Sequence, residues 1–438
     1  MNRRQIAEQI FLTGIESVLP DKLITSTMVL TGNSLHIGQM TFLLEKTRNI
    51  FVIGAGKASA IMAREVEKIL GDRITRGHII VKYGHSTDLK KIKISEAGHP
   101  FPDSNGFKAT KELLEIAREA GPEDLVICLL SGGGSSLMCD CPDELTPDDL
   151  VLVNKLLVNS GAGIREINAV RKHLSNVKGG RLAGAVYPAT LVSLILSDVI
   201  GDHPDIIASG PTAPDPTSYI DAIEVLEKFG IKTKLPARVI DYLYEGAMCR
   251  KPETPKPGDV IFNKTSNIII GSNRIALESA RLKAQEFNIN AVITEDELQG
   301  DAVSVSEYLV DAALKYRNDK HEVKPVCILL GGETTIKMTG NGTGGRNQHL
   351  ALLCARLLDN KPGITILCGG TDGTDGPSKA AGAVVDYETI ITAFNKNIDP
   401  EEYIKDFNSY NFFRKIGGHI ITGPTMTNVM DIVIIIVD

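Results

Sequence analysis

LVICLLSGGGSS, residues 125–136, joins a fully apolar run of six residues to a turn of glycines and serines. A run so short and so apolar predicts a strand that is buried on both faces, as the strands of parallel sheets are. The same order of strand and glycine turn occurs in NIFVIGAGKAS at 49–59, and a third apolar run ends at Asp198. Patterns typical of helices separate these runs, at 60–70, 108–120 and 146–160. We therefore predict an α/β fold with a parallel sheet that helices cover on both faces.

Three chemically active features follow strands of this predicted sheet. They are Lys57, the loop 131–136 and Asp198. Because parallel α/β sheets bind ligands beyond the carboxyl ends of their strands, we expect all three features at one edge. Lys57 could neutralise a phosphate or an acid group, and Asp198 could orient Mg²⁺ or accept a proton from a substrate hydroxyl. A plain connection without a ligand is the alternative for each turn.

The two glycine turns supply the candidate binding residues of the first half of the chain. Backbone amides of such turns, together with serine hydroxyl groups, can hold the oxygen atoms of a ligand. The candidates are Gly54, Gly56, Ser131, Gly132, Gly133, Gly134, Ser135 and Ser136. Neither turn is a P-loop, since G-x-x-x-x-G-K-[ST] does not occur in the chain. Ser59 also replaces the third glycine of the dinucleotide fingerprint, which weakens the case for a nicotinamide cofactor.

A cluster of cations lies in INAVRKHLSNVKGGRLA at 167–183. Its members are Arg171, Lys172, Lys178 and Arg181. In a chain with a formal net charge of −7, such a cluster could provide local positive charge for an anionic substrate, and Lys178 is our candidate. A solvated helix face is the alternative. We interpret His173 as a structural residue and not as a base.

The segment KPETPKPG at 251–258 contains three prolines in eight residues, which is typical of a linker. After it the alternation of strands and helices starts again, with an apolar run at 266–271. We therefore predict two domains, at 1–250 and 258–438, both of the α/β class. A length of 438 residues is ordinary for two domains.

The second predicted domain contains a glycine-rich loop, GGETTIKMTGNGTGGRNQ, at 331–348. An apolar run at 326–330 precedes it, and an apolar helix pattern at 349–358 follows it. A helix that begins after such a loop presents free N–H groups to an anion, and Arg346 adds a guanidinium group there. The candidate residues are Gly332, Glu333, Thr334, Gly344, Gly345, Arg346 and Asn347. A mobile glycine-rich hairpin without a ligand is the alternative.

A second acidic loop, GGTDGTDGP at 369–377, follows an apolar run and places two carboxylates three residues apart. Carboxylates among glycines and threonines suit a hard cation that bridges phosphate groups, so Asp372 and Asp375 are our candidates for Mg²⁺. The spacing of an EF-hand is not met, which argues against a dedicated calcium site.

Composition narrows the class of protein. Hydrophobic residues make up 43% of the chain and charged residues 23%, as in soluble globular proteins. The net charge of −7 argues against nucleic acid as the main partner. The sequence contains no run of about 18 apolar residues, so we do not expect a membrane span. The seven cysteines are scattered, which suits reduced thiols in the cytoplasm.

The order of these motifs along the chain resembles the glycerate 2-kinase family with a C-terminal MOFRL domain. The segments that carry the resemblance are GAGKAS, EAGHPFPD, SGGGSS, INAVRKHLS with KGGRLA, LSDVIGD, SGPT, GGET, GTGGRNQ and GGTDGTDGP. They extend over nearly the whole chain. The resemblance implies an N-terminal Rossmann-like parallel sheet, a smaller C-terminal α/β domain, and an active site in the cleft between the two domains.

The resemblance also implies that ATP, with Mg²⁺, phosphorylates D-glycerate to 2-phosphoglycerate. Under this interpretation Lys57 and Arg346 hold the carboxylate of glycerate or the phosphoryl group, and Asp198 orients or deprotonates the hydroxyl. Glu333, Asp372 or Asp375 would position Mg²⁺. Two alternatives stay open, a hydroxypyruvate reductase that uses NAD(P)H and a non-catalytic protein that binds nucleotides or sugar phosphates. A homodimer is also left open.

Overall fold

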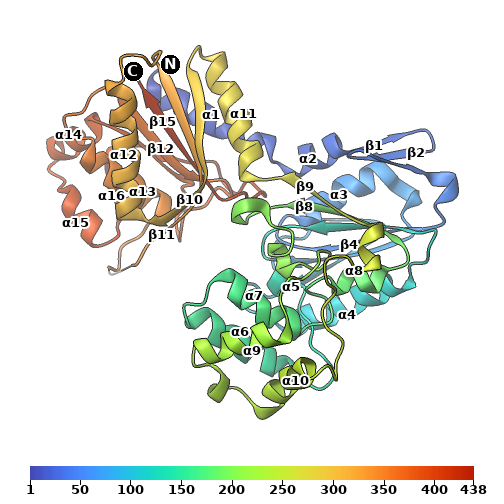
Figure 1. Cartoon of the computed structure of the whole chain (residues 1–438). Coiled ribbons are helices and arrows are strands. Elements are labelled where there is room, and N and C mark those ends of the chain that lie inside the picture. The colour runs from blue at the N-terminus through green and yellow to red at the C-terminus, as the bar shows by residue number, and fades with distance from the viewer. Residues whose placement is uncertain (339) are drawn as a thin grey trace. The chain divides into compact units, whose positions relative to one another are not determined.

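The computed structural model describes residues 1–338 and 340–438, which form two compact units (Figure 1). The central unit comprises residues 23–270, and the terminal unit comprises residues 1–22 together with 271–438. Thr339 belongs to the predicted glycine-rich loop and lies outside the described residues. Within the described part of the chain, no helix is both long and apolar enough to cross a membrane.

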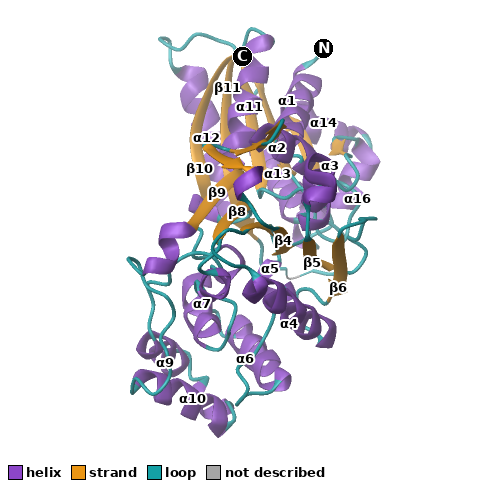
Figure 2. Ribbon diagram, turned by 90° about the vertical axis from the view of Figure 1, so that its right-hand side faces the viewer, coloured by secondary structure: helices purple, strands orange, loops and turns teal. Residues whose placement is uncertain are grey.

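A six-stranded sheet forms the middle of the central unit, in the order β6-β5-β4-β7-β8-β9. Its strands are β4 (Ile50–Ala55), β5 (Arg76–Lys82), β6 (Ile92–Ala97), β7 (Leu125–Leu130), β8 (Thr190–Leu196) and β9 (Thr265–Gly271). Strands β6 to β8 run parallel, and Figure 2 shows β4, β5 and β6 side by side. Every residue of β4 and β7 is buried, so the prediction of a parallel sheet is confirmed.

Helices cover both faces of this sheet. Alternate side chains of the strands, such as Ile53 and Cys128, pack with helices α4 (Ser104–Glu119) and α8 (Arg181–Val186) in one apolar core. Helix α3 (Ser59–Leu70) covers the opposite face (Figure 1). This division follows from strand geometry, because successive side chains of a strand point to opposite faces.

Four further helices of the central unit form an apolar core of their own. They are α6 (Pro147–Asn159), α7 (Ile164–His173), α9 (Tyr219–Lys228) and α10 (Ala237–Ala247). Thr146 caps α6, since its side chain accepts a hydrogen bond from the backbone N–H of Asp149. Helices α9 and α10 are missing from the prediction, although their apolar faces complete this core.

Smaller elements connect the main ones. An antiparallel sheet consists of β1 (Met28–Thr31), β2 (Ser34–Ile37) and β3 (Met40–Leu43), and the short helices are α2 (Pro20–Thr27) and α5 (Gly134–Leu137). Turns of 3₁₀ helix occur at Leu44–Lys46, Gly71–Arg73, Ile200–Asp202, Ile207–Ser209, Lys232–Lys234 and Val260–Lys264. The three strands of the small sheet are absent from the prediction.

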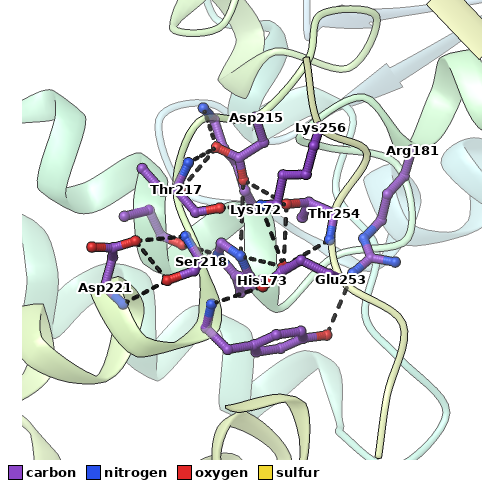
Figure 3. Close-up of polar contacts among 12 residues, drawn as sticks. Lys172, His173, Arg181, Asp215, Thr217, Ser218, Asp221, Glu253, Thr254 and Lys256 are labelled. Carbon is purple, nitrogen blue, oxygen red and sulfur yellow. Dashed lines mark hydrogen bonds and ion pairs between the residues drawn. The ribbon is translucent and has the colours of Figure 1, made fainter. Parts of the chain in front are cut away.

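Residues 251–258 are irregular, as predicted, but they do not link the two units, because the central unit continues to residue 270. Glu253 accepts a hydrogen bond from His173 Nε2 at 2.9 Å, and Thr254 donates one to Asp215 at 3.0 Å (Figure 3). Burial alone would raise the pKa of Glu253, but the hydrogen bonds from His173 and Thr254, together with the nearby charges of His173 and Lys256, outweigh burial and lower this pKa to about 2. The prediction of a linker is wrong, since composition reveals irregular structure but not what that structure packs against.

The same network uses two cations of the predicted cluster. Lys172 is 2% exposed, and its ammonium nitrogen lies 3.1 Å from Oδ1 of Asp215, which is fully buried. Arg181 donates a hydrogen bond to the backbone oxygen of Pro252 at 3.2 Å. His173 has a partner at each ring nitrogen, which agrees with a structural role. Lys172 and Arg181 therefore hold the segment 251–258 in place.

The terminal unit contains a mixed sheet of six strands, in the order β10-β11-β15-β12-β13-β14. The strands are β10 (Asn290–Asp301), β11 (Val326–Thr335), β12 (Ile364–Gly370), β13 (Gly382–Asp386), β14 (His419–Ile420) and β15 (Asp431–Val437). Among the described strands of this second sheet, only β10 and β11 pair in parallel, and the last strand, β15, lies antiparallel between β11 and β12. An α/β unit is confirmed here, but its strand directions differ from those of the first sheet.

Helices of the terminal unit pack on this mixed sheet. They are α1 (Arg3–Ser17), α11 (Asn273–Glu286), α12 (Ala302–Asn318), α13 (Arg346–Leu357), α14 (Glu388–Asn395), α15 (Pro400–Lys405) and α16 (Ser409–Ile416). Helices α12, α13, α14 and α16 share one apolar core with the sheet. Helix α1 packs against α11, β12 and β15, and its Phe11 is fully buried beside Gly369.

The position of α1 explains why the compact units differ from the predicted domains at 1–250 and 258–438. The first helix belongs to the terminal unit, and the boundary after the central sheet falls at residue 270. The sequence shows that α1 has an apolar face. It cannot show which of two apolar sheets that face covers, because both would bury it equally well.

Candidate active site

The carboxyl ends of β4, β7 and β8 bring together the three features predicted for the first sheet. The backbone N–H of Lys57 donates to the backbone oxygen of Gly132 at 2.9 Å. A Cβ atom placed on Gly132 would lie 2.1 Å from Oδ2 of Asp198, and one on Gly133 would lie 3.4 Å from Cε of Lys57. A lysine and an aspartate thus flank one glycine loop, as the geometry of parallel sheets predicts.

Three predicted binding residues serve instead to pack the two turns against each other. A Cβ atom on Gly54 would lie 2.1 Å from the backbone oxygen of Leu129, and one on Gly56 would lie 2.0 Å from Oγ of Ser131. Ser131 is buried, and its hydroxyl oxygen accepts from the backbone N–H of Ala58 at 3.0 Å. We correct the prediction for Gly54, Gly56 and Ser131, because the two glycines pack tightly against β7 and Ser131, and the Ser131 hydroxyl already accepts a hydrogen bond within the fold.

Two histidines, His85 and His99, lie near Lys57. His85 Nδ1 donates to the backbone oxygen of Lys57 at 3.1 Å, and a Cβ atom on Gly133 would lie 2.9 Å from the His99 ring. Burial, and after it the charge of Lys57, lower the pKa of His99 to about 4. Neither histidine was among the candidates. The signal that could have indicated His99 was the segment EAGHPFPD, which carries part of the family resemblance.

Lys178 and Arg171 lie on the serine side of the same loop. Both line a narrow pocket together with Ser135 and Ser136. Lys178 donates to the backbone oxygen of Met138 at 2.8 Å, and burial lowers its pKa. Burial also lowers the pKa of Arg171 to about 10. Neither cation forms an ion pair with a carboxylate in the described part of the chain, so both stay candidates for contact with an anion.

In the terminal unit, Arg346 begins α13 and is held by two carboxylates. Its Nε and Nη2 donate to Asp431 at 2.6 and 3.0 Å, and its Nη1 donates to Glu333. Burial alone would lower the pKa of Arg346, but the hydrogen bonds and charge of Asp431 outweigh burial and raise it. Asp431 was not predicted, although it precedes the apolar run IVIIIV. Arg346 is therefore fixed in one orientation and remains charged.

The other candidates of the glycine-rich loop lie near this arginine. Thr334 and Asn347 are buried, and each has a side-chain oxygen without a hydrogen-bond partner among the described residues. Gly332 packs against Leu298, while Gly344 and Gly345 pack against Ser409 and Asp375. The unpartnered oxygens agree with a polar ligand, but the glycines are explained by packing alone.

Asp375 disagrees with the predicted role as a metal ligand. Its Oδ1 accepts from the backbone N–H of Asn347 at 3.0 Å, and its Oδ2 accepts from the backbone N–H of Gln348 at 2.8 Å. Gln348 Nε2 donates to the same Oδ2 at 2.9 Å. These are the free N–H groups at the start of α13, which the sequence predicted for an external anion. The carboxylate of Asp375 satisfies them from within the fold.

Two family models match the chain. A domain of unknown function (DUF4147) matches residues 6–244, and the MOFRL family matches residues 326–431. A D-glycerate 2-kinase of Thermotoga maritima is 38% identical over 436 residues, which are 98% of this chain and 97% of that relative. The chain belongs to the glycerate 2-kinase family. The resemblance drawn from the order of motifs is thereby confirmed.

Other members of the glycerate 2-kinase family agree over similar lengths. A glycerate 2-kinase of Pyrococcus horikoshii is 38% identical and covers 100% of this chain and 98% of the relative. The crystal structure of glycerate kinase from Thermotoga maritima matches with a TM-score of 0.88 at 37% identity, over 99% of each chain. A relative from Agrobacterium vitis with the provisional name hydroxypyruvate reductase is 41% identical over 87% of this chain and 85% of its own.

The resemblance to glycerate 2-kinases implies Mg²⁺, so we tested whether side chains of this chain fit that ion. Among the described residues, no group of three or more histidine, cysteine, aspartate or glutamate side chains could hold a metal. Asp375 does not fit, since both its oxygens already accept hydrogen bonds from α13. Asp372 is partly exposed and accepts from the backbone N–H of Thr374 at 2.9 Å. The described residues therefore offer no metal site built from three or more histidine, cysteine, aspartate or glutamate side chains.

Proposed function

We propose that this chain catalyses the ATP-dependent phosphorylation of D-glycerate and that the product is 2-phosphoglycerate. Relatives named D-glycerate 2-kinase or glycerate 2-kinase match it at 38% identity over nearly their whole length, which supports the reaction. The observation that carries the proposal is the pair of Lys57 and Asp198 on either side of one glycine loop. Phosphoryl transfer needs charge neutralisation and positioning more than covalent catalysis, and this pair offers both.

Each residue has a specific role in this proposal. Lys57 neutralises negative charge on the glycerate carboxylate or the transferring phosphoryl group. Asp198 orients the attacking hydroxyl and accepts its proton. Arg346, held rigidly by Asp431 and Glu333, contributes a second fixed positive charge. That the residues of the two units act in one cleft stays a prediction from the sequence, as do the cytoplasmic location and the homodimer.

The proposal is tested by product identification. Purified protein is mixed with ATP, Mg²⁺ and D-glycerate, and the product is coupled to enolase, which consumes 2-phosphoglycerate directly. Signal without added phosphoglycerate mutase supports the proposal, whereas signal only with the mutase shows that 3-phosphoglycerate is made. If the protein transfers a phosphoryl group to D-glycerate from none of the nucleoside triphosphates, the proposal that it is a kinase is overturned.

Lys57→Ala tests the residue on which the proposal rests. We expect kcat/KM to fall by at least about 100-fold, since one fixed charge at a phosphoryl centre is worth about 3 kcal/mol. Lys68→Ala, at an exposed lysine on α3, is the matched control and should keep full activity. A loss of less than about tenfold, or 1.4 kcal/mol, removes Lys57 from the site.

A nicotinamide-dependent hydroxypyruvate reductase is the second candidate, because one relative bears that provisional name. The turn after β4 packs directly on Ser131, so its glycines are already explained without a dinucleotide. Oxidation of NADH by hydroxypyruvate in the absence of ATP would favour this candidate over the kinase. ATP binding without turnover of D-glycerate would favour a binding protein over both.

A further inference from the structure

Ser135, Ser209 and Asn168 form a chain of hydrogen bonds behind the glycine loop. The two serine oxygens lie 2.6 Å apart, and Ser209 Oγ donates to Oδ1 of Asn168 at 2.9 Å. Ser209 is fully buried and Asn168 is 2% exposed. Ser135 is partly exposed and lines the narrow pocket described above. The chain thus runs from the protein interior to the surface of the candidate site.

The direction of each hydrogen bond in this chain is determined. Asn168 Nδ2 donates to the backbone oxygen of Ile206 at 3.2 Å, which turns Oδ1 of the amide toward Ser209. Oδ1 can only accept, so the single proton of the Ser209 hydroxyl points to Asn168. Ser209 Oγ must then accept from Ser135. The reverse arrangement would leave Oδ1 buried without a donor, which costs about 1–3 kcal/mol.

The backbone around Ser209 is held in a rare conformation. Ala208 and Ser209 have φ of 51° and 62°, in the left-handed region that non-glycine residues seldom adopt. Such residues cost of order 1–3 kcal/mol each and occur mainly at functional sites. A Cβ atom on Gly134 would lie 2.9 Å from Cβ of Ala208, so this turn packs directly under the glycine loop. The strained turn brings the Ser209 hydroxyl within reach of Ser135.

We propose that Asn168 and Ser209 are positioning residues that commit Ser135 to act as a hydrogen-bond acceptor, so that Ser135 selects a hydroxyl group of a bound substrate. Its own proton is directed inward, and the lone pairs that remain would repel an anionic oxygen. From its glycine turn alone, Ser135 was expected to bind the oxygen atoms of an anionic ligand, whereas its inward-directed proton makes it an acceptor. It rests on the proposed function, which supplies two substrates with hydroxyl groups.

The neighbouring Ser136 provides an internal contrast. Its hydroxyl has no hydrogen-bond partner within the described part of the chain, although it lines the same pocket. Ser136 can therefore still donate to an anion, while Ser135 cannot. Lys178 and Arg171 line this pocket as well, so the site combines donors for an anionic group with one acceptor for a neutral hydroxyl. A small hydroxy acid has both groups.

Calorimetric binding tests the role of Ser135 without requiring turnover. The probes are D-glycerate and its two deoxy analogues, D-lactate without the 3-hydroxyl and 3-hydroxypropionate without the 2-hydroxyl, and ATP with its 2′-deoxy and 3′-deoxy analogues. We expect Ser135→Ala to weaken one hydroxyl-bearing probe by about 5–20-fold, as for one hydrogen bond. The affinity of the matching probe without that hydroxyl should not change. The probe that responds identifies whether glycerate or the ribose supplies the hydroxyl.

Variants of the two inner residues test the positioning role. Ser209→Ala and Asn168→Ala free the Ser135 proton, so both should reduce the preference for the same hydroxyl and raise KM more than they lower kcat. Asn168→Asp keeps an acceptor for Ser209 and should preserve most of the preference. Ser160→Ala, at a partly exposed serine that caps α6 through Leu157, is the matched control. Near-ultraviolet circular dichroism checks that each variant is folded.

The outcomes separate this inference from the proposed kinase activity. If Ser135→Ala weakens probes with and without the hydroxyl alike, or changes no probe, the acceptor role is wrong even if the wild-type protein phosphorylates glycerate. If the hydroxyl preference is lost but no phosphoryl transfer exists in the wild type, the proposed function fails and the acceptor role stands. If Ser209→Ala, Asn168→Ala and Asn168→Asp all lose affinity for the probes in proportion to their loss of thermal stability, these residues have only a structural role. That result would overturn the inference.

Discussion

Asparagine in place of Asp375 separates two roles of this carboxylate, the predicted ligation of Mg²⁺ and the observed capping of α13. The two oxygens accept three well-formed hydrogen bonds, from the backbone of Asn347 at 3.0 Å and from Gln348 at 2.8 and 2.9 Å. An amide has nearly the same shape, but an NH₂ group replaces one oxygen and cannot accept. The variant therefore disturbs the cap while it removes the charge.

The magnitude follows from the displaced titration of Asp375. Burial raises its pKa from 3.8 to about 6, against the opposing effect of the hydrogen bonds. An acid with a higher pKa in the folded state binds its proton more tightly there, so its contribution is present below pH 3.8 and is lost as the pH rises to about 6. This loss is about 3 kcal/mol, since each pH unit corresponds to about 1.4 kcal/mol.

Urea unfolding of the wild type and of Asp375→Asn measures how much the titration of Asp375 contributes to the free energy of unfolding. The unfolding is followed by far-ultraviolet circular dichroism, because the chain contains no tryptophan. Between about pH 4 and about pH 7, we expect the wild type to lose about 3 kcal/mol of stability that the variant does not lose. The Mg²⁺ concentration for half-maximal turnover should be the same in both proteins. Asp372→Asn tests the other predicted ligand in the same turnover assay.

One combination of results would refute the capping role. If Asp375→Asn keeps the wild-type dependence of stability on pH but needs much more Mg²⁺ for turnover, the carboxylate contacts the metal and the sequence prediction was right. Unchanged stability together with unchanged Mg²⁺ dependence would exclude both roles.

Three further substitutions test other parts of the structure. Gly56→Ala would place Cβ 2.0 Å from Oγ of Ser131, so we expect a loss of about 2–4 kcal/mol in urea unfolding; a loss below about 1 kcal/mol would contradict the tight packing of the two turns. Asp431→Asn removes the carboxylate that holds the Arg346 guanidinium, so we expect kcat/KM to fall by about 100-fold in folded protein. Unchanged kinetics would show that Arg346 and Asp431 lie outside the active site. Lys172→Met leaves the fully buried Asp215 without its cation and should cost about 3–5 kcal/mol; the double variant with Asp215→Asn should recover part of the loss if the ion pair is the cause.

The parallel sheet and its functional edge could be predicted because they depend on local patterns and a general rule. Short apolar runs such as 125–130 favour strands buried on both faces, and the glycine turn that follows marks the end of the strand. The rule that ligands bind beyond the carboxyl ends then joined Lys57, the loop 131–136 and Asp198 across more than one helix. The order of motifs identified the family for the same reason, since it is a property of the linear chain.

The packing and hydrogen-bond partners of individual side chains could not be predicted, because they depend on which segments meet in the folded chain. The amphipathic pattern of α1 is visible in the sequence, but only the fold places Phe11 on the sheet of the terminal unit. Asp375 and Ser135 both read as ligand residues from their loops. Their hydrogen-bond partners, Gln348 and Ser209, come from distant segments and change a metal ligand into a helix cap and a donor into an acceptor. Residue type is therefore set by the sequence, whereas the role of a polar group is decided by which donor or acceptor the tertiary structure places beside it.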